Sequence, residues 1–163
     1  MATSFQKPVN VFLSWIEKDI DFFRYFGLTD DEAKELAVKR SKAILLQANA
    51  ALKLRCKCSV DFADCNTNTD EYNFELNDAE VYLIGSIMYE LYLFKDFAKL
   101  KLENVNYTAT ELRVFDPSNA RSTFMEMYKN IVENNKLLIG EYRDTDRETG
   151  QYLTINYSKY DEE

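Results

Sequence analysis

The stretch that decides the fold runs from Asn77 to Lys101 and reads NDAEVYLIGSIMYELYLFKDFAKLK. Between Val81 and Phe94 only Gly85, Ser86 and Glu90 interrupt the apolar residues, so apolar side chains point in nearly every direction around a helical turn. The stretch is too short and too interrupted to cross a bilayer. We therefore expect a central helix that other helices cover on most sides.

Gly85 and Ser86 lie in the middle of this predicted helix. A glycine inside a helix costs up to about 1 kcal/mol relative to alanine and usually has a packing reason. We therefore predict a close helix contact at Gly85 and Ser86.

Three further segments space their apolar residues as helices do: residues 9–26, 30–53 and 117–140. Thr29 and Glu32 form the pattern of a capping box at the start of the second of these segments. A chain with 4 Gly and 2 Pro has few turn residues and suits long helices. The predicted fold is mostly α, a four-helix bundle of two helical hairpins that occupies residues 1–140 as one domain.

The segment 141–163 loses the helical period and alternates from residue 152 to residue 157, which predicts an extended or β-hairpin C-terminal tail. A lone strand pairs either with its own neighbours, near Arg143, or with another chain. We expect the tail to add little to the helical core and to bind a partner. Its candidate partner-binding residues are Tyr152, Leu153, Ile155, Tyr157 and Tyr160.

The composition excludes several function classes. A net charge of −8 opposes binding to nucleic acid, since affinity for phosphates comes from clustered Lys and Arg. The sequence has no His and no nucleophile, phosphate-binding or metal motif at a recognisable spacing, so we expect neither catalysis nor a cofactor. Secretion and membrane insertion also lack a signal, which indicates an intracellular protein.

Three cysteines, Cys56, Cys58 and Cys65, fall within ten residues, and such clusters often bind zinc. The chain lacks a histidine to complete the site, and the C-x-C spacing lacks the two intervening residues common in zinc knuckles. We therefore expect no metal and reduced thiols with no specific role. The surrounding residues 54–76 lose the helical period, which predicts a long loop that crosses between the two hairpins.

Three helix-start patterns carry a family resemblance: LTDDEA at 28–33, FELNDAE at 74–80 and FDPSNA at 115–120. In this order they resemble the head-to-tail connector, or neck adaptor, proteins of tailed bacteriophages. The sequence departs from the family at Tyr92, where we expected Trp, and in the cysteine-bearing loop.

The resemblance implies a structural virion protein of the neck, made in the host cytoplasm. It implies a helical body that forms a homo-oligomeric ring beneath the portal protein, with further neck or tail proteins as partners. DNA would pass through the ring without sequence-specific binding. A terminal extension would reach a neighbouring ring.

Two other classes of function stay open. A small acidic phage protein can mimic DNA and inhibit a host nuclease, with carboxylates in the place of phosphates. The acids here are interleaved with 20 Lys and Arg, which disfavours that reading. The chain can also be another structural part, for tail completion or the baseplate.

Overall fold

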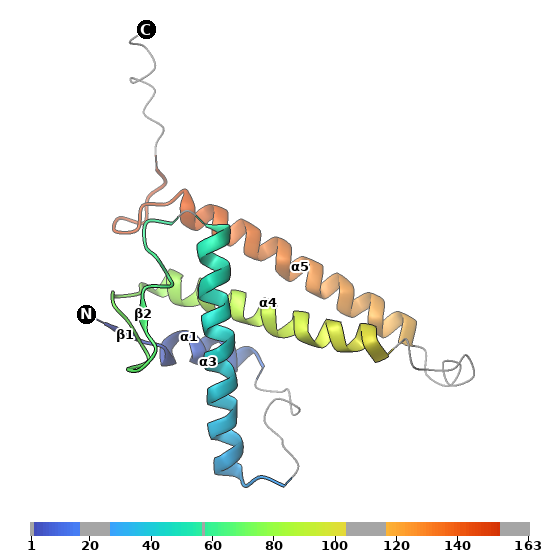
Figure 1. Ribbon diagram of the computed structural model, residues 1–163. Coiled ribbons are helices and arrows are strands. Elements are labelled where there is room, and N and C mark those ends of the chain that lie inside the picture. Colours follow the sequence, from blue (N-terminus) through green and yellow to red (C-terminus); the bar gives the residue numbers. More distant parts are fainter. Residues whose placement is uncertain (1, 17–26, 57, 104–116, 154–163) are drawn as a thin grey trace.

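A computed structural model describes residues 2–16, 27–56, 58–103 and 117–153, and these are mostly helical (Figure 1). The prediction of a mostly α fold is confirmed. The helices are α1 (Gln6–Trp15), α3 (Asp30–Arg55), α4 (Asp78–Glu103) and α5 (Pro117–Arg143). The same residues also form three strands of two residues each: β1 (Thr3–Ser4), β2 (Cys65–Asn66) and β3 (Glu71–Tyr72).

The central helix α4 contacts each of the three other helices in the described ranges, as its apolar sequence predicts. The α4 side chains of Ile84, Ile87 and Met88 are fully buried by these contacts. Two large side chains of α4, Tyr82 and Phe94, are about half exposed to solvent. The core therefore forms around α4, with α1, α3 and α5 as its neighbours.

The predicted four-helix bundle of two hairpins is not confirmed. Figure 1 shows α5 running beside α4, whereas α3 crosses α4 steeply. The buried face of α3 includes the small side chains of Ala37, Ser41 and Ala48, which let a neighbouring helix approach closely. The hydrophobic period of a helix identifies its buried face, but it does not set the angle at which another helix crosses that face.

Two predictions about the irregular segments are wrong. Residues 54–76 contain β2 and β3 rather than only a loop, and β1 joins them in an antiparallel sheet of order β1-β3-β2. The N-terminal residues supply β1, and helix α1 begins at Gln6 rather than at Val9, the start of the predicted segment 9–26. Strands of two residues are too short to show an alternating pattern, so sequence periodicity could not find them.

Tyr72 explains why this small sheet packs on the helices. Its ring is fully buried, it pairs with Thr3 on one side and Cys65 on the other, and its hydroxyl donates a hydrogen bond to Asn49 Oδ1 of α3 at 2.9 Å. Burial raises the pKa of the Tyr72 hydroxyl well above its usual value, so the group stays protonated and remains a donor.

The start of α3 agrees with the sequence pattern, whereas the end of α5 does not. Thr29 Oγ1 accepts a hydrogen bond from the Glu32 backbone N–H, and the Glu32 carboxylate accepts from the Thr29 N–H at 2.8 Å, which completes the capping box at α3. At the other end of the chain, α5 continues through Gly140 to Arg143. Residues 17–26, the second half of the first predicted helix, lie outside the described part of the chain.

Candidate interaction surface at the C-terminal hairpin

Directly after α5 the chain folds back on itself as a hairpin, residues 144–153. The Leu153 N–H donates to Asp144 O at 2.8 Å, and the Asp146 N–H donates to Gln151 O at 2.7 Å. Gly150 takes a positive φ of 68° at the turn, a conformation that glycine adopts without a Cβ penalty. Of the two alternatives for the start of the tail, the described residues adopt the intramolecular hairpin.

Asp146 organises the tip of this hairpin. Its Oδ1 accepts hydrogen bonds from the Glu148 N–H at 3.1 Å, from the Thr149 N–H at 2.8 Å and from the Thr149 hydroxyl at 2.8 Å. These three donors stabilise the carboxylate and lower the pKa of Asp146, the Thr149 backbone bond having the largest effect. The side chain therefore closes the turn in the manner of an Asx turn.

Arg147 ties the hairpin to the first turn of α4. Its Nε lies 2.6 Å from Glu80 Oε1 and its Nη2 lies 3.1 Å from Glu80 Oε2. The same Nη2 also donates to the backbone oxygen of Glu75, and the guanidinium carbon lies 5.8 Å from the centre of the Phe74 ring. A bidentate, charge-assisted contact of this kind fixes orientation as well as position.

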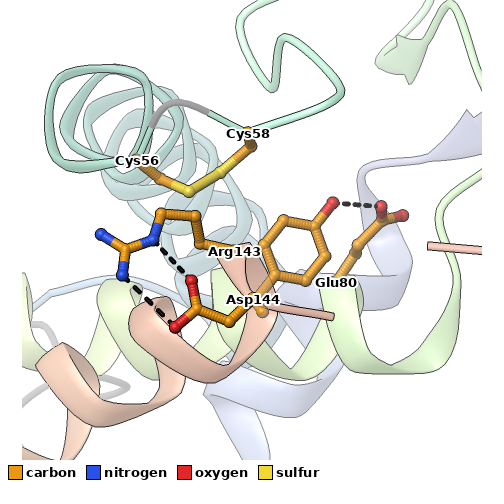
Figure 2. The surroundings of a disulfide bond; sticks show 6 residues. Cys56, Cys58, Glu80, Arg143 and Asp144 are labelled. Atoms are coloured by element: carbon orange, nitrogen blue, oxygen red, sulfur yellow. Dashed lines mark hydrogen bonds and ion pairs between the residues drawn. A yellow bond between two sulfur atoms is a disulfide. The ribbon is translucent and has the colours of Figure 1, made fainter. Parts of the chain in front are cut away.

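Glu80 is fully buried, and its carboxylate accepts hydrogen bonds from three residues. Besides Arg147, it accepts from the Tyr142 hydroxyl at 2.6 Å, drawn in Figure 2, and from the Asn77 backbone N–H at 2.9 Å. Burial raises the pKa of Glu80, but the hydrogen bonds from Arg147, Tyr142 and Asn77 outweigh it, so the net pKa is lowered. Glu80 is therefore a buried carboxylate that stays ionised near neutral pH.

The predicted partner-binding residues divide into two groups. Tyr152 and Leu153 belong to the hairpin, where they are 72% and 58% exposed. Ile155, Tyr157 and Tyr160 lie outside the described residues. The hairpin thus presents two large side chains to solvent at the point where the remaining tail sequence begins.

Gly85 and Ser86 both lie at helix contacts, but they face different helices. A Cβ placed on Gly85 would come 2.7 Å from Val11 Cγ1 and 3.6 Å from the Pro8 backbone oxygen, both on α1. Ser86 instead faces α5, where its hydroxyl donates to Asn135 Oδ1. The adjacent glycine and serine therefore serve two separate interfaces of α4.

A second buried polar cluster surrounds Asn135. Its Nδ2 donates to Glu90 Oε2 at 2.8 Å, and Glu90 Oε1 lies 2.9 Å from Arg55 Nη1 at the end of α3. The Glu90 side chain is only 3% exposed. Through Glu90, polar contacts join three helices. The sequence pattern does not indicate this, because Glu90 reads as one break in an apolar run.

An exposed aromatic group lies on α1 and α4. The Trp15 ring makes edge contacts with Tyr82, at a centroid distance of 5.4 Å, and with Tyr89, at 5.7 Å. Trp15 is 36% exposed and Tyr82 is 48% exposed. Tyr82 also lines a concavity of about 340 Å³ between α4, the end of α5 and the hairpin. Tyr82 and the hairpin therefore border one depression.

The expectation of three reduced cysteines is wrong. Cys56 and Cys58 form a disulfide with a Cα–Cα distance of 5.2 Å (Figure 2). Cys65 alone has a free thiol. Cys56 caps α3 with an extended backbone, at φ −122° and ψ 127°. The chain leaves the helix there, which lets Cys58 turn back toward Cys56.

Two features are absent from the part of the chain that the structure describes. Among them no three His, Cys, Asp or Glu side chains lie close enough together to hold a metal ion. None of the helices in the described ranges has the length and apolar character needed to cross a membrane.

Comparisons with protein-family models, with curated proteins and with solved structures found no match to this chain.

Proposed function

We propose that the chain is a structural virion protein of a tailed phage, a head-to-tail connector that forms a ring between the portal and the tail. The helical body would be the wedge of the ring, in the two-hairpin bundle that the sequence pattern predicts. The residues after the hairpin would dock on the portal or on a neighbouring ring. This proposal rests on the three helix-start patterns and on one structural observation.

That observation is the anchoring of the hairpin. Because Arg147 is bonded to the buried Glu80, the hairpin has a fixed position relative to α4. The exposed Tyr152 and Leu153 therefore start the alternating sequence at a defined place on the body. A strand that is added to another chain gains main-chain hydrogen bonds for affinity and alternate side-chain contacts for specificity, and a fixed starting point reduces the entropy lost on docking.

The charge of the chain suits a passage for DNA. A net charge of −8 disfavours tight contact with phosphates, so a ring built from such subunits would let DNA slide. Several exposed acids are paired with lysines, as in Lys42 with Asp70 and Lys53 with Asp61. Paired acids are poor substitutes for a row of phosphates, and this supports the connector over the DNA mimic.

Two measurements distinguish the connector from the alternatives. Quantitative mass spectrometry of purified virions should find the chain in the neck fraction, at the copy number of a ring component. Native mass spectrometry should find a ring when the chain is mixed with its portal. A chain that is absent from virions, stays monomeric with the portal and inhibits a nuclease would instead be a DNA mimic. A copy number that matches the baseplate would assign it to that structure.

A further inference from the structure

The Cys56–Cys58 disulfide lies at the edge of a concavity of about 580 Å³. Cys58, Ser59 and Val60 line one side of it, and the end of α5 and the hairpin line the other, including Arg143 and Leu153. Figure 2 shows the Arg143 side chain alongside the disulfide. The volume falls within the range of small-molecule sites.

The two sulfurs differ in access. Cys56 is 5% exposed, and its N–H donates to Leu52 O at 2.8 Å in the last turn of α3. Cys58 is partly exposed and lines the concavity. Cys58 is therefore the more accessible of the two cysteines, and attack by an external thiol at its sulfur would make Cys56 the leaving group.

Stabilisation of the fold does not explain this disulfide. In the chain-entropy account, a cross-link stabilises a protein according to the length of the loop that it closes. Here the sequence separation is 2, so the unfolded chain loses little freedom. Cys56 is in addition already positioned by its hydrogen bond to Leu52. A disulfide of this kind can open without unfolding the helices around it.

We propose that Cys56–Cys58 is an exchangeable disulfide whose Cys58 sulfur forms a mixed disulfide with a low-molecular-weight thiol that carries a carboxylate. The concavity holds the thiol. Arg143 is 60% exposed and lies 2.9 Å from the Asp144 carboxylate. When the thiol binds, Arg143 releases Asp144 and pairs with the carboxylate of the thiol.

The chemistry balances with the thiol as reductant. Its thiolate attacks Cys58 Sγ, the bond between the two cysteine sulfurs breaks, and Cys56 leaves as a thiolate that takes a proton. A second small thiol can then attack the mixed disulfide, which releases a small-molecule disulfide and leaves Cys58 reduced. Two electrons pass from the two small thiols to the protein.

Cys65 takes no part in this exchange. It lies on β2, paired with Tyr72 of β3, and does not line the concavity. Burial raises the pKa of its thiol, and the nearby Asp64 and Asp61 raise it further, so little thiolate forms at neutral pH. It provides a matched control for the other two cysteines.

The first arm of the test uses the wild-type chain and reduced glutathione in native buffer. We expect intact-mass spectra of acid-quenched samples to show first one glutathione on Cys58 and then the dithiol form, with the far-UV circular dichroism unchanged. Reduction that occurs only as the helices unfold would overturn the proposal, because the disulfide would then be structural.

The second arm uses oxidised glutathione and two variants in a Cys65→Ser background. With Cys56→Ser, the lone Cys58 should form the mixed disulfide at least about tenfold faster than the lone Cys56 does with Cys58→Ser, because only Cys58 is accessible. Equal rates in two folded variants, or an adduct on Cys65 in the wild type, would contradict the assignment.

The third arm tests recognition of the carboxylate. With Arg143→Gln, the rate of wild-type disulfide opening by glutathione should fall several-fold relative to the rate with 2-mercaptoethanol, which has no carboxylate. An unchanged ratio of the two rates would show that Arg143 does not bind the carboxylate, and it would contradict the proposed class of thiol.

Discussion

Arg147 Nε lies 2.6 Å from Glu80 Oε1, which joins the hairpin after the last helix to the first turn of the central helix, 67 residues earlier in the chain. The contact makes residues 144–153 part of the folded body, although the sequence pattern assigned everything after residue 140 to a separate tail. A segment that contributes only to partner binding therefore begins no earlier than residue 154.

The first prediction concerns this ion pair. Arg147→Met leaves the buried Glu80 without its cationic partner, so the free energy of unfolding should fall by about 2–3 kcal/mol. Arg143→Met is the control, because Arg143 and Asp144 form an exposed pair and such pairs contribute little to stability. Urea unfolding followed by circular dichroism measures both variants. Equal losses in the two would show that Arg147 does not anchor the hairpin.

The second prediction follows from the lowered pKa of Glu80. The contacts that lower it stabilise the fold above the ordinary pKa near 4.5, and this stabilisation is lost as the pH falls through the lower pKa of the folded state. The difference in unfolding free energy between the wild type and Glu80→Gln should be constant near neutral pH and shrink below about pH 4.5. Urea unfolding of both proteins across this pH range measures the difference. If the difference grew as the pH fell, the pKa of Glu80 would be raised by folding, not lowered.

The third prediction tests the contact between α1 and α4. Gly85→Ala should destabilise the protein by about 1–3 kcal/mol, since its Cβ would lie 2.7 Å from the stiff Val11 side chain. In a Val11→Ala background this penalty should become smaller, because only the Val11 Cβ, at 3.1 Å, remains close to the added methyl group. Gly140→Ala is the matched control: that position has open space around it, so alanine should stabilise α5 by about 0.5–1 kcal/mol. A loss at Gly85 that stays equally large without the Val11 methyl groups would rule out this steric cause.

The fourth prediction separates the hairpin from the rest of the tail. Deletion of residues 144–163 removes Arg147 and should lower the thermal midpoint, whereas deletion of 154–163 should leave it close to that of the wild type. Differential scanning calorimetry of the two truncated chains decides this. If both deletions lowered the midpoint equally, residues 154–163 would themselves stabilise the body.

The sequence was most informative where local chemistry controls the structure. The capping box of Thr29 and Glu32 begins α3 as expected, and the apolar run from Val81 onward forms the buried centre of the fold. Both signals depend on residues within a few turns of one another. The close approach at Gly85 was also readable, because a glycine in a helix needs a nearby cause.

The contacts that sequence reasoning missed join residues far apart in the chain. Glu80 entered the sequence analysis only as the last residue of the helix-start pattern FELNDAE, yet its partners Tyr142 and Arg147 lie more than 60 residues away. The strands were missed because two residues cannot show a period. The disulfide was missed because its formation depends on how the chain leaves α3 at Cys56.

The proposed role in the neck is tested most directly by complementing a phage that lacks this gene with the chain truncated after residue 153. Because the truncated chain keeps the Arg147–Glu80 contact, we expect it to fold. Electron microscopy of the lysate should then show separate heads and tails and few infectious particles, while the full chain restores attachment. Normal yields of tailed, infectious particles with the truncated chain would contradict docking through residues 154–163 and the connector account that depends on it.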